Sequence, residues 1–534
     1  MNVNVFFDIP KVQQVDLLSK WLHNVDIVAL DSATCSHKWR PDFLVLLRSP
    51  ELSLGESPFS SNSLFEWIIL RKISFTDVII DMCNSVLSDD IRRVALLEVL
   101  GPKLKVINIT GDQNGFTDEY DQTPVQTDQL LFDLTQHCRN LTKLSIMWAT
   151  LDGSLSFLIN TNQLLESVDL CACYIITTST LKSILRLPNL SALYIRESTV
   201  ADFTTVPVCE PNMQCQMLNG RSCNIKPNVL SWLCQSMPNL LKLHVDVRAG
   251  SDLASIASHC RHVTMASITL ESPLTAADAR AIANHWQSIE LLTLLRPFEW
   301  KNHPVCDESV ALVFIDQCHS LLQLKLSPSD PATDNVGKSN YSLLVYDNKN
   351  AVLSKKDNAR SRLTDLFVPS LSAQALATIV QKCVYLNTLR IAHPAPIAVD
   401  PNAAEFSLQH LSGTSVKTLF LVNCSNLDYA HLQPLQGMVK LVLCNVGLSS
   451  LKSHRLLNVC NQSPDLAALY IHNCPGIDAS IVLGALEQCP MLTHFEYCVR
   501  EKMNRYRVEE PAVSIMSTLI RKTYPNLKDF VAQF

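Results

Sequence analysis

The sequence predicts an α/β solenoid, a fold in which short strand-and-helix units stack along one axis. The phrase CRNLTKLSI at 138–146 returns as CHSLLQLKL at 318–326 and as CVYLNTLRI at 383–391. When looser copies are counted as well, its L-x-x-L-x-L ending occurs about fourteen times, typically 22 to 30 residues apart. The segments between copies, such as LATIVQKC at 376–383, place apolar residues at helical spacing and end on Cys. Each repeat therefore reads as a helix, a cysteine and a strand.

One repeat cannot bury its own leucines, whereas stacked repeats bury them in a continuous ladder. A cysteine suits the crowded junction between helix and strand because free Cys behaves as a small buried hydrophobe. We expect reduced, buried thiols at the recurring positions Cys138, Cys260, Cys318, Cys383 and Cys489. This pattern resembles the cysteine-containing class of leucine-rich repeats, and the resemblance implies a horseshoe-shaped solenoid over residues 101–534.

The predicted domain plan has a helical module at 1–50, a linker with the first irregular repeats at 51–100, and the repeats at 101–534. A fifty-residue step between the copies at 190 and 240 holds either a degenerate repeat near 213–218, which we prefer, or a loop. The segment 327–362 is rich in Asp, Asn, Ser and Lys and cannot join a leucine ladder. We predict a surface insertion there.

The N-terminal residues 6–48 have a different rhythm from the repeats. Ile9-Pro10 precedes apolar residues at helical spacing, and Asp26 is a plausible N-cap, so three short packed helices are expected. The Ile-Pro opening, the L-x-x-W-L and D-I-x-x-L helices, and a closing Cys then Trp-Arg resemble the F-box. The spacing Cys35-x-x-x-Trp39 is one residue longer than the usual pattern, and Thr34 stands where Val is common.

The F-box is the helical module that docks onto the adaptor subunit of cullin-RING ubiquitin ligases. The resemblance implies adaptor contacts through Ile9, Pro10, Leu18, Leu22, Ile27 and Leu30. If these residues form an F-box, Ile9, Pro10, Leu18 and Leu22 should lie partly exposed on the free chain. The alternative is a helical cap that shields the first repeat, as solenoids require, and it would hide the same residues.

Strand alternation predicts which residues face away from the leucine core. The substrate-binding candidates on that concave surface are Tyr194, Arg196, His244, Lys325, Arg390, Phe420, Tyr470, His472, His494 and Glu496. Exposed aromatic residues beside polar groups are typical interface anchors. Strands also favour aromatic residues as a covering for sheet surface, so binding and covering remain open.

Other functional classes find little support. A net charge of −6 and a pI near 6.2 give no basic footprint for nucleic acid. No run of eighteen apolar residues and no secretion signal occur, so we expect no membrane association and a cytoplasmic or nuclear protein. Nucleotide, hydrolase and zinc motifs are absent. Cys171-x-Cys173 and the trio Cys209, Cys215 and Cys223 match no common metal site. We therefore expect no catalytic residues, metal or cofactor.

The resemblance as a whole implies a substrate-recognition subunit of an SCF-type cullin-RING ubiquitin ligase. The N-terminal helices would hold the adaptor, and the concave repeat face would hold a protein substrate. The alternative is a repeat protein that acts as an interaction scaffold or inhibitor without a ligase role. Neither function is enzymatic.

Overall fold

The computed structural model divides the chain into two compact units, unit 1 at Met1–Asp246 and unit 2 at Val247–Phe534. The residues it describes are 9–21, 24–33, 40–47, 49, 62–73, 75–81, 89–111, 124–149, 151, 154–174, 176–201, 209–296, 306, 308–327, 361–368, 371–392, 408–422, 424, 435, 437–444, 446, 454–472, 474, 479–498 and 529–533.

Unit 1 carries a ladder of parallel strands, each paired with the next one along the chain. The strands are β1 (Asp77–Asp81), β2 (Val106–Thr110), β3 (Lys143–Met147), β4 (Ser167–Cys171), β5 (Ala192–Arg196), β6 (Met217–Gly220) and β7 (Lys242–Val247). The helices between them are α6 (Asp90–Leu100), α7 (Pro124–His137), α8 (Ser154–Thr161), α9 (Thr178–Leu185) and α10 (Pro227–Gln235).

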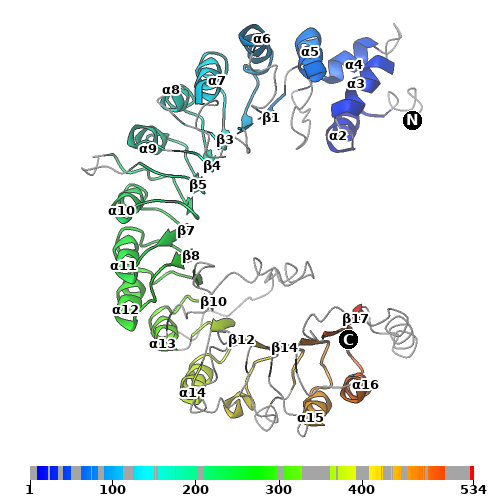
Figure 1. Ribbon diagram of the computed structural model, residues 1–534, viewed down its shortest axis with the longest axis vertical. Coiled ribbons are helices and arrows are strands. Elements are labelled where there is room, and N and C mark those ends of the chain that lie inside the picture. Colours follow the sequence, from blue (N-terminus) through cyan, green and yellow to red (C-terminus); the bar gives the residue numbers. More distant parts are fainter. Residues whose placement is uncertain are drawn as a thin grey trace, which may run out of the picture. The chain divides into compact units, whose positions relative to one another are not determined.

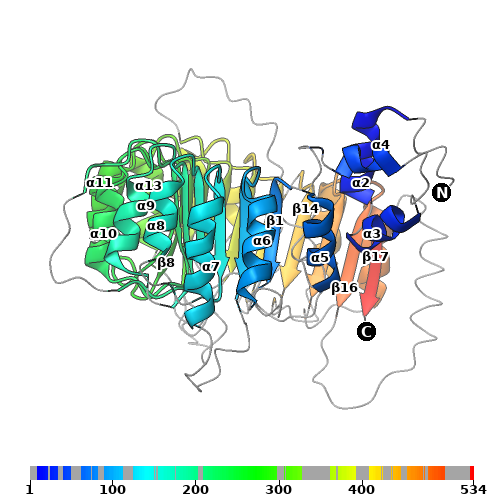
Figure 2. The same ribbon diagram turned by 90° about the horizontal axis from the view of Figure 1, so that it is seen from above.

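The register of unit 1 aligns the repeated leucine position. Leu144, Val168, Leu193, Leu218 and Leu243 are partners across five consecutive strands, and all five side chains are buried. A parallel pair needs a crossover connection, usually a helix. The helices of the unit run along one face of these strands (Figures 1 and 2). We call the opposite face, which no described helix covers, the strand face.

Unit 2 repeats the arrangement, with parallel pairing from strand to strand. Its strands are β8 (Met265–Leu270), β9 (Leu291–Leu295), β10 (Gln323–Ser327), β11 (Asp365–Val368), β12 (Thr388–Ala392), β13 (Thr418–Val422), β14 (Lys440–Cys444), β15 (Ala468–His472), β16 (His494–Cys498) and β17 (Asp529–Gln533). Its helices are α11 (Gly250–His259), α12 (Ala276–His285), α13 (Glu308–Gln317), α14 (Ala373–Lys382), the 3-10 turn η4 (Gln409–Leu411), α15 (His454–Gln462) and α16 (Ala479–Gln488). The prediction of an α/β fold of repeated strand–helix units is confirmed at this level.

The turn that leaves each strand also repeats in unit 1. Trp148, Ala172 and Glu197 directly follow β3, β4 and β5, and all three have a positive φ between 50° and 53°. Each donates its backbone N–H to the next repeat, as Trp148 does to Cys171 O at 3.0 Å and Ala172 does to Arg196 O at 2.7 Å. This neighbour bond holds the left-handed conformation, which non-glycine residues seldom adopt. The repeats are therefore joined at their turns as well as through their strands.

In several repeats a cysteine directly follows the helix, at the position that the sequence predicts. Cys138, Cys260, Cys318, Cys383 and Cys489 are all buried and free, as predicted. The equivalent position after α12 holds Trp286, which is fully buried and donates its indole N–H to Cys260 O at 2.9 Å. The junction thus accepts a large ring where that ring can satisfy its polar atom against the neighbouring repeat.

The N-terminal region forms three short helices, as predicted: α2 (Lys11–Trp21), α3 (Asn24–Ala33) and α4 (Arg40–Leu47). The expectation that Asp26 is an N-cap is wrong, because α3 begins at Asn24 and Asp26 lies in its first turn. A carboxylate still favours that position through the helix dipole. The next helix, α5 (Asn62–Arg71), leads to β1, and unit 1 includes all four helices.

The predictions for the irregular regions of the repeat pattern have different outcomes. The preferred degenerate repeat near 213–218 is confirmed, because β6 pairs with both β5 and β7. The ladder already includes β1, within the region predicted to hold the first irregular repeats. The predicted insertion at 327–362 falls almost wholly on residues 328–360, which lie outside the described residues. Over the part of the chain that the structure describes, no helix has the length and apolar character to span a membrane.

Candidate protein-interaction surfaces

Alternation along the strands is as the sequence predicts over most of both ladders. In β5, for example, Leu193 and Ile195 are buried, whereas Tyr194 and Arg196 between and after them are half-buried on the strand face. The other half-buried candidates are His244, Lys325, Arg390, Tyr470, His472, His494 and Glu496. Phe420 is an exception. Its side chain is only 4% exposed, so the prediction that it is a surface anchor is wrong.

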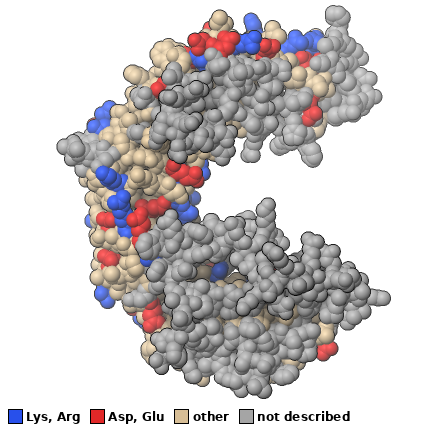
Figure 3. Space-filling model, in the orientation of Figure 1, with Lys and Arg blue, Asp and Glu red and all other residues tan. Residues whose placement is uncertain are grey.

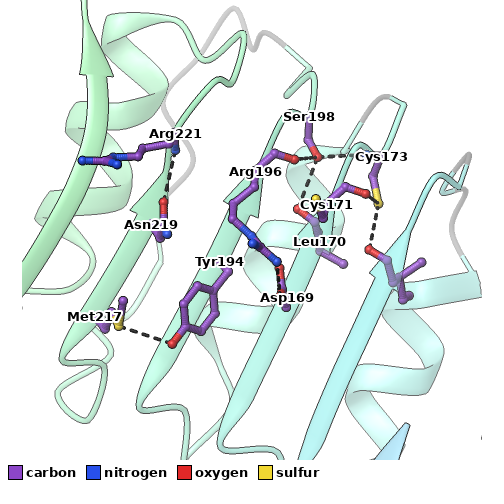
Figure 4. A network of polar contacts seen from close by, with 11 residues as sticks. Asp169, Leu170, Cys171, Cys173, Tyr194, Arg196, Ser198, Met217, Asn219 and Arg221 are labelled. Carbon is purple, nitrogen blue, oxygen red and sulfur yellow. Dashed lines mark hydrogen bonds and ion pairs between the residues drawn. The ribbon is translucent and has the colours of Figure 1, made fainter. Parts of the chain in front are cut away.

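The strand face of unit 1 carries a polar network centred on an ion pair (Figure 4). Arg196 on β5 donates Nη2 to Asp169 Oδ2 on β4 at 2.7 Å and Nε to Asp169 Oδ1 at 3.4 Å. Burial raises the pKa of the Asp169 carboxyl, and the bond and charge of Arg196 oppose that rise. The fork-shaped contact matches guanidinium and carboxylate geometry. One acid and one base thus neutralise each other in the middle of this surface.

The neighbouring strands continue the network with uncharged groups. Tyr194 donates its hydroxyl to Met217 Sδ on β6 at 3.3 Å, and Asn219 Oδ1 accepts the backbone N–H of Arg221 at 3.3 Å. Burial lowers the pKa of His244 on β7, and the positive charges of Arg221 and Lys242 lower it further. His244 is therefore neutral at pH 7, since an ordinary histidine has a pKa near 6.5. The face offers mixed donors and acceptors around one internal ion pair.

The strand face of unit 2 has a different chemistry, in which cations and aromatic rings alternate. Lys325 Nζ lies 5.9 Å and Arg390 Cζ lies 4.3 Å from the ring centroid of Phe367. Arg390 Cζ and Lys440 Nζ lie 5.7 and 5.4 Å from the ring of Phe420. All are within the ~6 Å range of cation–π attraction. We call the full set the cation–ring row: Lys325, Phe367, Arg390, Phe420, Lys440 and Tyr470.

The row explains why Phe420 is not an exposed anchor. Arg390 and Lys440 flank its ring from the two neighbouring strands, and Phe367 is likewise only 9% exposed between Lys325 and Arg390. The cations themselves stay half-buried at the surface. Burial lowers the pKa of Lys440, whose Nζ also lies 5.1 Å from the Tyr470 ring. For the two phenylalanines, covering the sheet is therefore the correct interpretation.

Beyond the row, β15 and β16 carry a histidine–carboxylate pair on the strand face. His472 Nε2 on β15 lies 3.3 Å from Glu496 Oε1 on β16. His494 Nδ1 lies 2.8 Å from Thr493 Oγ1, and which of the two donates depends on the histidine tautomer. The structure thus brings His472, His494 and Glu496 together on two adjacent strands.

The N-terminal helices form a second candidate surface. Pro10 is exposed and Ile9 and Leu30 are half-buried, but Leu18 and Ile27 are fully buried. The F-box interpretation requires Leu18 to be partly exposed on the free chain, and the burial of Leu18 agrees instead with the alternative of a cap. Ile27 is equally inaccessible, because both side chains belong to the core. Leu22 lies outside the described residues. Among the side chains of α2 that the structure describes, the most exposed apolar one is Val12, at 71%.

Asp31 on α3 ties these helices to the rest of unit 1. This 2% exposed carboxylate accepts the indole N–H of Trp67 at 2.9 Å and Nε of Arg71 at 3.0 Å, both from α5. Arg40 at the start of α4 places Nη2 3.9 Å from the same carboxylate. Charged hydrogen bonds inside a protein are among its stronger contacts. The position of α3 on α5 is thus fixed by one buried acid.

Three of the cysteines that could suggest a metal site donate hydrogen bonds to backbone carbonyl oxygens instead. Cys173 Sγ donates to Ile146 O at 3.5 Å, Cys215 Sγ donates to Met217 O at 3.5 Å, and Cys223 Sγ donates to Ile195 O at 2.6 Å. Burial raises the pKa of all three thiols to about 12, which disfavours the thiolate that a metal needs. No group of three or more potential metal ligands occurs among the described residues.

Sequence reasoning missed two of these features. Asp31 lies in the last turn of the apolar helix α3, and only the packing of α3 on α5 reveals its partners. Lys440 was overlooked although it precedes the phrase LVL at 441–443 in the position that Lys143 and Lys242 occupy as the first residues of their own strands. The repeat phase alone could have found it. Comparison with known proteins adds no identity: no protein-family model matches the chain, and no significant match to a curated protein exists.

Proposed function

We propose that the protein is a substrate-recognition subunit of an SCF-type cullin-RING ubiquitin ligase, built as a leucine-rich-repeat solenoid behind an F-box-like module. In this proposal α2–α4 bind the adaptor subunit, and the strand faces bind a protein substrate. Catalysis of ubiquitin transfer belongs to the partners.

The observation that carries the proposal is the order of the parts. A three-helix module that resembles the F-box in sequence precedes a ladder of repeats whose strand face no described helix covers. Pro10 and Val12 at the start of α2 leave apolar surface exposed. An adaptor can reach these two residues, whereas it cannot reach Leu18 or Ile27. The docking contacts are therefore proposed for the start of α2, supported by the buried residues beneath it.

A rigid tie between the module and the repeats suits a receptor. Asp31 binds Trp67 and Arg71 and so fixes α3 on α5, the helix that leads to the first strand. A ligase receptor must hold its substrate at a defined distance from the transferring enzyme, and a fixed joint favours that. The burial of two residues of the N-terminal helices, Leu18 and Ile27, supports a second candidate function.

The burial of Leu18 and Ile27 favours that second candidate, a repeat protein whose N-terminal helices only cap the ladder. Such a protein would bind a partner on its strand face as a scaffold or inhibitor, without an adaptor. Solenoids need a terminal unit that covers the open end of their core. The two functions differ in whether any protein docks on α2.

The test is co-purification of the full-length chain with a cullin-RING adaptor subunit. A Pro10→Ala, Val12→Asp variant should lose the adaptor, because a carboxylate placed in an apolar interface is left without a partner. The matched control is Ile91→Asp on α6, which changes an apolar side chain that is 81% exposed outside the module. The control should retain the adaptor, and both variants should melt at the temperature of the parent protein.

Two results would contradict the proposal. The unmutated chain would fail to capture any adaptor of this class, or the α2 variant and the α6 control would capture it equally well. A lowered melting temperature of the α2 variant alone, with no adaptor captured by the parent, supports the cap instead.

A further inference from the structure

Two phenylalanines are exposed on the side of unit 1 along which its helices run, which we call the helix face. Phe132 on α7 is 52% exposed and Phe157 on α8 is 66% exposed. The two helices are consecutive in the ladder and lie side by side (Figures 1 and 2). Exposed apolar residues scattered singly are normal, whereas a contiguous exposed patch usually marks an interaction site. We call these two residues the phenylalanine pair.

The two rings of the pair lie at the same level along their helices. Ser154 Oγ at the start of α8 donates to Asp128 Oδ1 on α7, a contact between positions 26 apart. The strands of the same two repeats, β3 and β4, pair with an offset of 24. Counting back from Phe157 by either value reaches residues 131 to 133 of α7, whose centre is Phe132. Since packed helices lie ~8–10 Å apart, the two rings form one patch.

The exposed residues around the pair carry no charge. Among the described side chains of α7 and α8, the other exposed ones are Gln129, Gln136, Asn160 and Thr161. The buried acid of α7, Asp133, accepts Nε of Arg93 at 2.6 Å, and α8 contains no charged residue. The neighbouring helix α6, in contrast, exposes both signs of charge, on Asp90, Arg92 and Glu98. Acidic and basic residues are likewise interspersed over the described surface in Figure 3. The patch on α7 and α8 is thus apolar at its centre and neutral at its edge.

A second copy of this chain fits these features. In a two-fold contact the same patch meets itself, so charges at its edge would meet like charges, and a neutral edge avoids that repulsion. Because the rings are level, a two-fold axis parallel to the helices places Phe132 against Phe157 of the other copy. An axis across the helices places each ring against its own counterpart. Either arrangement packs two rings on two rings, and aromatic pairs attract beyond the area they bury. We propose that the chain forms a two-fold dimer through the phenylalanine pair.

The area of the patch predicts a weak, reversible dimer. A phenylalanine side chain buries ~200 Å², so the exposed fractions of 52% and 66% leave about 100 and about 130 Å² to bury. The four uncharged side chains around the rings roughly double that area, to about 450 Å² per copy, below the ~600 Å² per copy at which stable specific interfaces begin. The dissociation constant should therefore be on the order of 10–100 μM.

An amphipathic helix of another protein is the less favoured occupant. Such a helix lays its apolar side into a hydrophobic groove. Phe132 and Phe157 instead protrude from two helix surfaces, with more than half of each side chain exposed. Protruding rings at one level suit a surface that carries the same two rings.

The test is sedimentation of the full-length protein in reducing buffer, at concentrations from about 1 to about 200 μM. The parent should be monomeric at the lowest concentration and mostly dimeric at the highest. The variant Phe132→Ser, Phe157→Ser should associate about tenfold or more weakly, and its helices should persist because Ser and Phe have similar helix propensities. The matched control is Met213→Ser, Met491→Ser, which truncates side chains that are 54% and 59% exposed elsewhere. The control should associate as the parent does.

Charged variants test the same contact by restoring it. Phe157→Lys should weaken self-association about tenfold or more, because it places an unpaired charge in an apolar contact. Mixing it with Phe157→Glu should restore a dimer if each ring meets its own counterpart, whereas mixing it with Phe132→Glu should restore one if Phe132 meets Phe157. One of the two mixtures should associate about tenfold more tightly than either of its members alone. A fluorescent label on one member lets sedimentation follow the mixed dimer.

The inference is overturned if the parent stays monomeric at about 200 μM, if the serine variant associates as the parent does, or if the methionine control loses association equally. It also fails if neither charged mixture restores a dimer, a result that does not depend on the stability of the serine variant. None of these measurements involves an adaptor. A protein that dimerises through the pair without capturing an adaptor retains this inference and loses the ligase proposal.

Discussion

The contact between Arg390 and Phe367 should contribute measurably to the stability of unit 2. The guanidinium carbon of Arg390 lies 4.3 Å from the centroid of a ring that is 9% exposed, and Arg390 itself is half-buried. Cation–π contacts contribute about 0.5–1 kcal/mol at exposed sites and about 2 kcal/mol when desolvated. A half-buried pair at this distance should lie between those limits, at about 1 kcal/mol.

A double-mutant cycle isolates that term. Arg390→Met keeps a long apolar stem, and Phe367→Leu keeps a large apolar side chain, so each change removes one half of the contact. The sum of the two single losses should exceed the loss in the double variant by about 1 kcal/mol. Unfolding in urea gives each free energy, followed by circular dichroism and by tryptophan fluorescence. Coincidence of the two transitions is required, because stacked repeats can unfold in parts.

The control cycle combines Lys325→Met with Phe420→Leu. These residues lie three strands apart, a separation of ~14 Å, and should be additive within about 0.5 kcal/mol. A coupling energy below about 0.3 kcal/mol between Arg390 and Phe367 would refute the reasoning, as would an equal coupling in the control. Either result would mean that the rings of the row serve only as apolar cover.

Two further predictions concern the core. Leu243→Ala should lower the free energy of unfolding by about 2–5 kcal/mol, whereas Lys242→Ala beside it on β7 should change it by less than about 0.5 kcal/mol, and similar urea midpoints would mean that the strand phase is wrong. Burial raises the pKa of Cys138 and Cys318 to about 12 and of Cys383 to about 11, from an ordinary 9.0, so the folded state holds these protons more tightly. The contribution of these thiols to the free energy of unfolding should be fully present below pH 9 and should be lost as the pH rises toward 12. The loss should be less steep in Cys138→Ala. A urea midpoint that stays constant from pH 9 to 11 would contradict this.

The repeat phrase predicted most of the ladder because each copy encodes its own phase. An apolar residue at alternate positions can bury only one face of a strand. A degenerate copy near 213–218 was predicted from the fifty-residue step between the copies at 190 and 240, and β6 there pairs on both sides. The phrase search did not mark β1 or β2, whose sequences DVIID and VINIT carry Val and Ile in place of the spaced leucines. Val and Ile can occupy the same buried positions of the ladder as Leu. A search for spaced leucines alone therefore misses strands that meet the same packing requirement.

The candidate surfaces were harder to predict because burial depends on partners distant in the sequence. Alternation correctly assigned Phe420 to the strand face, but Arg390 and Lys440, which flank it, come from neighbouring repeats. Strand register decides that contact. Leu18 shows the same limitation among helices: an apolar helix position can face a partner or the core, and α2 turns this one inward. The fold follows from local periodicity, whereas exposure follows from assembly of the repeats.

The covered rings change which residues of unit 2 can recognise a partner. An exposed aromatic ring acts as an interface anchor through its own buried area. A ring flanked by two cations has little area left to bury, and its contribution becomes the placement of those cations. In unit 1 the central charges are already paired, since Arg196 binds Asp169 and burial and nearby positive charge keep His244 neutral. The two strand faces should therefore differ in what they present to a partner, with mixed polar groups around an ion pair on unit 1 and cations held against covered aromatic rings on unit 2.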